Sequence, residues 1–290
     1  MPFLRCTAVV FAAAAVSGGA CAQSRPAPPG VSAETTVAIA DSPFRIVTHT
    51  SGQGSAHRSP RPGTRRAPAA LPAPADRRTP LVVINVHDDE NTSMEAALIA
   101  LARVPARITE VKHTGARNLS IRRGAETFTV DPNRIFTDAG AALSLTRLSR
   151  MDTAMLRDVR AFADTLLVLA GAADATTIVT LHNNTDANYS ARSYLPGAEY
   201  AADAAAVHLT PGSDPDDFFF VTDRLLYDAL VAERFNVVLQ HPETVTDDGS
   251  LSVLAARRGQ RYANVEAQHG HTEVQRRMIE ALVRVLNAQR

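Results

Sequence analysis

The sequence predicts an α/β protein: a three-layer α/β/α sandwich around a mixed, mostly parallel central sheet. Short apolar runs rich in β-branched residues occur at 81–86, 177–181 and 235–240. Continuous apolar runs of this length are typical of strands that are buried on both faces, as in parallel sheets. Longer stretches with apolar residues at helical spacing separate these runs, and such alternation is typical of a sheet covered by helices on both sides.

The elements are expected in a regular order along the chain. After the first strand, Thr92-Ser93-Met94-Glu95 has capping-box spacing, which predicts a helix with Thr92 at its N-cap. Further strands are expected at 107–113, 119–121, 126–130, 218–221 and 262–266. Further helices are expected within 149–172, from Thr222 or Asp223 to Ala232, and over 272–286.

The first 22 residues have the features of an export signal. Arg5 precedes an apolar stretch, 8–16, that is too short to span a bilayer, and Ala20-Cys21-Ala22 fits the small-x-small cleavage rule. A lipoprotein signal with Cys21 as the anchored residue is the alternative, and a cytoplasmic chain with an apolar N-terminus is a third reading. We expect export to the periplasm or the extracellular space, with no transmembrane segment in the mature chain.

A linker is expected between the signal and the main domain. Residues 23–34 are rich in Pro, Ala, Ser and Gly, and 51–80 are rich in Pro and Arg, which predicts irregular, solvated chain. Two β-like runs within 35–49 could add edge strands to the sheet. We therefore expect a linker over 23–80 and a catalytic domain over 81–290.

Composition limits the partners and the metal ligands. Thirty basic and thirty acidic residues give no formal net charge, so nothing favours nucleic acid or an anionic membrane as a partner. Cys6 and Cys21 are the only cysteines, and both lie in or beside the signal. A metal site in the domain must therefore use His and carboxylate ligands.

Polar side chains that suit such a site follow three predicted strands. His87 and Glu90 follow the first strand, His182 follows the strand at 177–181, and Glu266 ends the strand at 262–266. In α/β proteins ligands bind at the carboxyl ends of strands. Two imidazoles and one carboxylate suit zinc and leave a position for water, and Glu266 could then act as general base. Alternatively, each His is a hydrogen-bonded structural residue.

The order of these motifs resembles the zinc carboxypeptidase superfamily. Asp131-Pro132-Asn133-Arg134-Ile135-Phe136 is similar to the Asp-Leu-Asn-Arg-x-Phe signature of its succinylglutamate desuccinylase/aspartoacylase branch. Leu181-His182-Asn183-Asn184-Thr185 is similar to the Leu-His-Asn-Thr-Thr of that branch. The resemblance spans roughly 81–266 and implies the fold of that superfamily.

The resemblance also implies residue roles. His87, Glu90 and His182 would bind one zinc ion, and Glu266 would activate the bound water and pass its proton to the leaving amine. By the same resemblance, Asn133 and Arg134 would bind a substrate carboxylate, and Arg117 would stabilise the oxyanion.

Several departures from the family leave alternatives open. Asp88-Asp89 could orient His87 or cap the following helix. His269 and His271 could line the pocket, bind a second metal, or lie on the solvated surface. A catalytic tyrosine could be any of four residues: Tyr189, Tyr194, Tyr200 and Tyr262.

The sequence thus predicts an exported zinc-dependent hydrolase that cuts an amide bond next to a free carboxylate. Export favours a peptide substrate. A deacylase of N-acyl amino acids is the first alternative, because the motif wording is closest to that branch. A non-catalytic exported binding protein with the same fold is the second.

Overall fold

The computed structural model describes residues 22–25, 33–51, 80–186 and 189–289. The predicted export signal, apart from Ala22, and most of the Pro/Arg-rich linker lie outside these residues. Among the helices of the described part, none combines the length and the apolar character that crossing a bilayer requires.

A ten-stranded mixed sheet forms the middle layer, as predicted. Its order is β1-β2-β3-β5-β4-β8-β12-β10-β11-β9. The four central strands β5, β4, β8 and β12 run parallel, and antiparallel strands extend the sheet on both sides. The strands are β1 (Ala22–Arg25), β2 (Ala33–Ile39), β3 (Ser42–Ser51), β4 (Leu81–Asn85), β5 (Ala106–Lys112), β8 (Thr177–Asn184), β9 (Ala204–His208), β10 (Phe218–Val221), β11 (Asn236–Gln240) and β12 (Arg261–Gln268).

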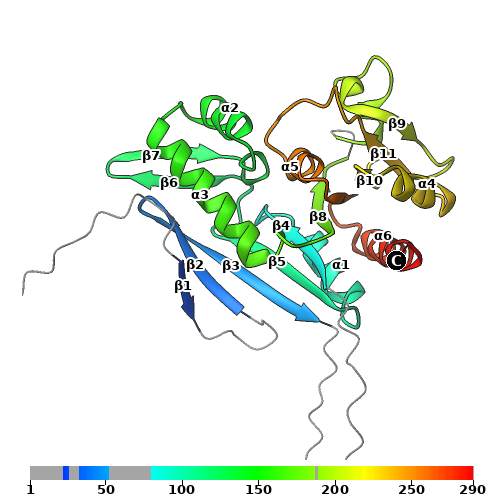
Figure 1. The fold of residues 1–290 in the computed structure, drawn as a ribbon, viewed down its shortest axis with the longest axis horizontal. Helices are drawn as coiled ribbons and strands as arrows, with labels where there is room; N and C mark the ends of the chain where they lie inside the picture. Colours follow the sequence, from blue (N-terminus) through cyan, green and yellow to red (C-terminus); the bar gives the residue numbers. More distant parts are fainter. Residues whose placement is uncertain (1–21, 26–32, 52–79, 187–188, 290) are drawn as a thin grey trace, which may run out of the picture.

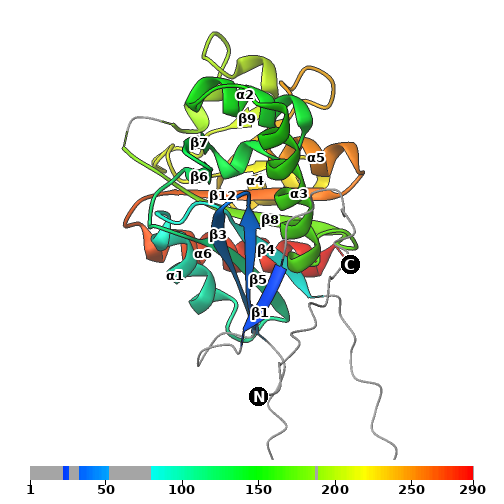
Figure 2. The ribbon, with the colours of Figure 1, turned by 90° about the vertical axis from the view of Figure 1, so that its left-hand side faces the viewer.

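Helices cover both faces of the sheet, which completes the three layers. One face carries α1 (Asn91–Ala100), α4 (Arg224–Ala232) and α6 (Thr272–Ala288). The other carries α2 (Asp138–Leu148), α3 (Thr153–Ala170), α5 (Leu251–Arg257) and the hairpin of β6 (Leu119–Arg123) and β7 (Glu126–Val130). Figure 1 and Figure 2 show α3 and α6 on opposite sides of the sheet. In β4, Val83 faces the first helix layer while Val82 and Ile84 face the second, which is why this strand is apolar up to Asn85.

The runs predicted within 35–49 are β2 and β3, and they belong to the sheet. β3 pairs antiparallel with β5 along its length. Val37, Ile39, Phe44 and Ile46 are almost completely buried in the core beneath α3. The folded unit therefore begins upstream of Leu81, where the catalytic domain was expected to start.

The predicted capping box is wrong. The helix α1 begins at Asn91, with Glu90 at its N-cap and no side-chain cap. The hydroxyl of Thr92 instead accepts a hydrogen bond from the backbone N–H of Gly270, 3.0 Å away. The Thr92 hydroxyl therefore makes a tertiary contact and does not cap the helix. The strand β1 also forms where irregular chain was expected, because its backbone pairs with β2.

Candidate metal centre and active site

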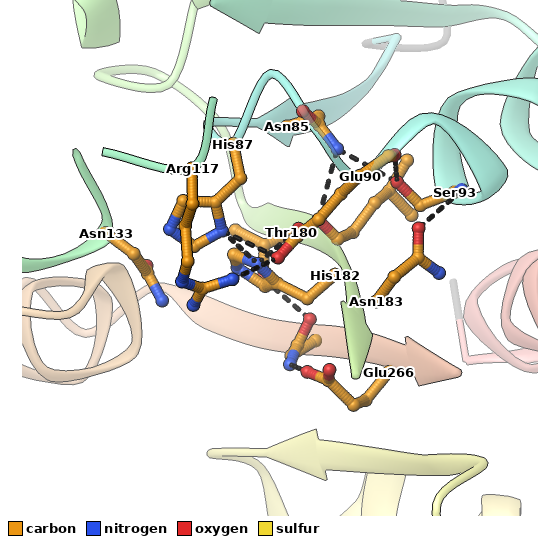
Figure 3. A network of polar contacts seen from close by, with 12 residues as sticks. Asn85, His87, Glu90, Ser93, Arg117, Asn133, Thr180, His182, Asn183 and Glu266 are labelled. Atoms are coloured by element: carbon orange, nitrogen blue, oxygen red, sulfur yellow. Dashed lines mark hydrogen bonds and ion pairs between the residues drawn. The ribbon is translucent and has the colours of Figure 1, made fainter. Parts of the chain in front are cut away.

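The ends of two neighbouring strands and the start of a helix bring the predicted metal ligands together. His87 follows β4 by two residues, Glu90 is the N-cap of α1, and His182 lies in β8, beside β4 in the sheet. All three side chains are buried. Nδ1 of His87 and Nδ1 of His182 are 3.2 Å apart, and each lies within 2.9 Å of a carboxylate oxygen of Glu90. Figure 3 shows the three side chains converging on one point.

This arrangement fits a single divalent ion. Two ligand atoms on a tetrahedral zinc ion, each about 2.0–2.1 Å from it, lie roughly 3.3 Å apart. The 3.2 Å separation of the two imidazole nitrogens is close to that value. The ligand-forming atoms of His87, Glu90 and His182 all lie within 4.8 Å of one another. These residues would hold a zinc ion, which supplies Lewis-acid chemistry when bound.

Asp131 orients the first histidine. Its Oδ1 accepts from Nε2 of His87 at 2.9 Å, which leaves Nδ1 to face the cluster. Carboxylates in this position fix the tautomer of a metal-binding imidazole. The sequence had suggested Asp88 or Asp89 for this role. The carboxylate that orients His87 is Asp131, the first residue of the Asp131–Phe136 motif. Its position in that motif is the sequence feature that could have identified it.

The charges of the cluster are strongly coupled. Burial opposes the charged form of His87, but Glu90 and Asp131 outweigh it and raise the pKa of His87 to about 9. Burial alone would raise the pKa of Glu90, yet His182 and His87 hold that pKa well below its usual range. The pKa of His182 is lowered, chiefly by burial. Without a metal, the cluster therefore holds a proton on His87 between two carboxylates.

Arg117 lies beside the cluster and donates to Oε1 of Glu90 at 2.7 Å. Its side chain is half-exposed, so its guanidinium can reach both the cluster and a bound molecule. Asp88 holds the loop that carries it. One carboxylate oxygen of Asp88 accepts from the backbone N–H groups of His113 and Gly115, at 2.6 and 2.8 Å, and the other pairs with Lys112. Asp88 thus neither orients His87 nor caps α1.

Glu266 is the neighbour of His182 across the sheet. The two residues are in register between β12 and β8. Burial and the negative charge of Glu90 raise the pKa of Glu266 to about 8. Nδ2 of Asn264 donates to Oε2 of Glu266 at 2.9 Å. The sequence analysis did not consider Asn264, although residues two apart on a strand share a face.

Asn133 and Arg134 lie in the short helix η1 (Pro132–Arg134), and Figure 3 shows Asn133 on the Arg117 side of the cluster. The Oδ1 of Asn133 is buried and has no hydrogen-bond partner among the described residues. Arg134 forms an ion pair with Asp248, from the loop before α5. A substrate carboxylate that binds Arg134 would therefore share the guanidinium with Asp248.

The four tyrosines fall into two groups. The rings of Tyr189, Tyr194 and Tyr200 pack against one another, and the hydroxyls of Tyr189 and Tyr194 are hydrogen-bonded. Burial raises the pKa of Tyr189 and Tyr194, and the nearby charge of Arg134 partly offsets this. Tyr262 lies apart from them in β12, where its hydroxyl is 2.5 Å from that of Thr180.

The two histidines after β12 do not join the cluster. His269 lies 3.1 Å from the hydroxyl of Thr92. His271 pairs with Asp217, and these two residues with Asp214 form a second, more exposed group of possible ligands.

The similarity of the chain to known proteins is limited. No protein-family model and no curated protein matches the chain. The chain is similar to a solved structure from Shewanella frigidimarina NCIMB 400, described as a candidate succinylglutamate desuccinylase/aspartoacylase. The match has 13% sequence identity and a TM-score of 0.34, and covers 91% of this chain and 71% of that one.

Proposed function

We propose that the chain is a zinc-dependent hydrolase that cuts an amide bond next to a free carboxylate. The observation that carries this proposal is the convergence of His87, Glu90 and His182, with Glu266 on the adjacent strand in register with His182. Two imidazoles and one carboxylate are a ligand set that leaves a position for water. A separate buried carboxylate beside that set is what general-base hydrolysis needs.

The residues around the cluster have the chemistry for the remaining tasks. Bound zinc would polarise the scissile carbonyl and lower the pKa of a water molecule. Glu266 would take the proton of the attacking water and return it to the leaving amine. Arg117 would stabilise the negative charge that develops on the carbonyl oxygen.

Asn133 and Arg134 would bind the substrate carboxylate. A guanidinium binds a carboxylate through two parallel hydrogen bonds, and the unpartnered Oδ1 of Asn133 adds an acceptor beside it. We favour a peptide as substrate because the N-terminal sequence predicts export. An N-acyl amino acid is the alternative, supported by the wording of the Asp131–Phe136 motif. An exported binding protein without activity is the remaining candidate.

Export itself is part of the proposal. It predicts that the chain made in a bacterial host is recovered from the periplasm or the medium, with an N-terminus near Gln23 by mass spectrometry. A lipid anchor would instead leave the chain in the membrane fraction, and Cys21→Ala would then release it. Recovery of the uncleaved chain from the cytoplasm would contradict export.

The hydrolase proposal is tested with Glu266→Gln in the full zinc-loaded chain. Hippuryl-L-phenylalanine serves as the peptidase probe and N-acetyl-L-aspartate as the deacylase probe, and the product identifies the class. We expect Glu266→Gln to bind zinc normally and to lose about 10²–10⁴-fold in kcat. The exposed Glu95→Gln is the matched control, with the wild-type rate expected. A Glu266→Gln variant as active as the wild type would contradict the mechanism.

A further inference from the structure

A stripe of polar side chains runs along β8 and β12 behind Glu266. Tyr262, Asn264 and Glu266 are two residues apart on β12, so their side chains share one face of the strand. Thr180 of β8 is in register with Asn264. All four side chains belong to residues that are between 1% and 6% exposed, so each polar group must find its partner inside the protein.

The four residues form a continuous hydrogen-bonded chain. The hydroxyl of Thr180 donates to Oδ1 of Asn264 at 3.2 Å, and Nδ2 of Asn264 donates to Oε2 of Glu266 at 2.9 Å. Since the single proton of Thr180 is used in this way, the Tyr262 hydroxyl 2.5 Å away must be the donor to Thr180. Burial raises the pKa of Tyr262, which keeps that hydroxyl protonated.

This chain fixes which end of the Asn264 amide faces the carboxylate. Turning the amide over would place its oxygen against Oε2 of Glu266, and these two acceptor oxygens repel each other when the carboxylate is ionised, as it must be for Glu266 to act as a base. The amide therefore stays as a donor to Glu266. With Oε2 occupied, Oε1 remains for proton exchange with a water at the cluster.

We propose that Thr180 and Asn264 are positioning residues that hold the Glu266 carboxylate for proton transfer, with Tyr262 fixing the hydroxyl of Thr180. This inference rests on the proposed function, because it needs Glu266 to act as the base. A network that only stabilises the core would affect folding and leave the kcat of the folded protein unchanged. Measuring kcat and KM separately distinguishes these two roles.

The test compares Thr180→Val with Thr180→Ser in the full zinc-loaded chain. Valine keeps the shape but lacks the hydroxyl, whereas serine keeps the hydroxyl but lacks the methyl group. On whichever of hippuryl-L-phenylalanine and N-acetyl-L-aspartate the wild type cleaves, we expect Thr180→Val to lose about 10–100-fold in kcat, as for other groups that orient site residues. KM and zinc content should stay near the wild-type values, and Thr180→Ser should recover most of the rate.

The buried Thr109→Val on β5 is the matched control, with the wild-type kcat expected, since Thr109 lies near Thr48 and outside the stripe. A wild-type kcat for Thr180→Val would overturn the inference. So would a Thr180→Ser variant as slow as Thr180→Val, because packing by the methyl group would then explain the loss.

A crystal structure of Thr180→Val separates this inference from the proposed function. If the wild type cleaves neither probe, the proposed function fails on its own. The positioning role is then tested by whether Asn264 still contacts Glu266 in the Thr180→Val structure. Loss of the contact between Asn264 and Glu266 in Thr180→Val supports the positioning chain, and an unchanged contact overturns it.

Discussion

At the scale of single residues, Asp131 links the cluster of His87, Glu90 and His182 to the Asp131–Phe136 motif. Its Oδ1 accepts from Nε2 of His87 at 2.9 Å and from the backbone N–H of Asn133 at 2.8 Å. Burial alone would raise the pKa of this carboxyl, but the hydrogen bond with His87 and the charges of His87, Arg134 and Arg117 hold that pKa well below its usual range, so Asp131 is ionised. One oxygen thus orients a predicted ligand and also begins the helix that carries Asn133 and Arg134.

We expect Asp131→Asn to weaken zinc binding about 10–100-fold, as do other changes to residues that orient metal ligands. The amide has the shape of the carboxylate but lacks the charge that raises the basicity of His87. Competition with a chromophoric chelator would measure the affinity. Asp138→Asn, which removes a charge in an exposed ion pair with Arg160, should leave the affinity unchanged. Equal affinities for all three proteins would contradict the role of Asp131.

Zinc binding at pH 7 is expected to release at least one proton. The pKa of His87 is raised to about 9, so its imidazole is charged at pH 7 and must lose a proton before Nδ1 can bind a cation. Zinc affinity should therefore rise with pH until about pH 9, and proton release should fade above it. Calorimetric titrations in two buffers of different ionisation enthalpy measure this release, and identical enthalpies in both buffers would rule it out.

At the scale of elements, Asp88 fixes the loop between β5 and β6 to the turn that carries His87. The loop holds Arg117 close to the cluster, although the loop itself is largely exposed. Two backbone N–H groups and the Lys112 ammonium bind the Asp88 carboxylate, and these interactions lower its pKa although partial burial opposes the charge. Asp88, in the turn after β4, thus helps to hold the positive charge of Arg117 beside the cluster.

Asp88→Ala should lower kcat/KM about tenfold while zinc content stays unchanged, because the loop loses three contacts but the ligands lose none. Lys112→Met is the matched control. It removes the ion pair but leaves both hydrogen bonds that the backbone N–H groups of His113 and Gly115 donate to Asp88, so a smaller loss is expected. Faster amide exchange at His113 and Gly115 in Asp88→Ala would report the loosened loop. If exchange and kcat/KM both stay at the wild-type values, Asp88 does not position Arg117.

The elements with strong sequence patterns were predicted, and those held by tertiary contacts were not. The apolar runs at 81–86 and 177–181 are β4 and β8, and Asp223 caps α4 through the N–H of Leu226. The helix α2 gave no signal because its buried face is built largely of small residues. There Gly140 approaches Gly249 so closely that a Cβ on Gly140 would lie 2.1 Å from the Cα of Gly249.

At the scale of the whole molecule, residues 33–51, which lie inside the expected linker, are part of the core. Five apolar residues of β2 and β3 are at most 5% exposed: Val37, Ile39, Phe44, Ile46 and Val47. At about 1.5–3 kcal/mol each, their burial contributes on the order of 10 kcal/mol, which is comparable to the whole stability of a typical domain. Without them, β5 would become an exposed edge strand.

A fragment of residues 81–290 is therefore expected to be unfolded or aggregated. Adding residues 33–51 as a separate peptide should restore folded protein, since the strands pair through backbone hydrogen bonds with β5. Circular dichroism and a thermal melt would measure both samples. A cooperative melt of the fragment alone, at the temperature of the full chain, would show that β2 and β3 are dispensable.

The predicted ligands lie close together because their positions depend on strand ends, which the sequence indicates. Contacts between loops that are distant in the chain are not marked by any pattern in the sequence. The ion pair of Arg134 with Asp248 joins residues 114 positions apart, and no local spacing marks it. The same holds for Thr180, which appears in the sequence as one more residue of an apolar strand and is identified only by the register of β8 with β12.

The most direct test of the account is the zinc content of the purified full chain, measured by mass spectrometry of metals beside a His87→Ala, His182→Ala double variant. We expect about one zinc per wild-type chain and none in a double variant that melts cooperatively. Zinc-free wild-type protein after incubation with zinc, or equal zinc in both proteins, would contradict it.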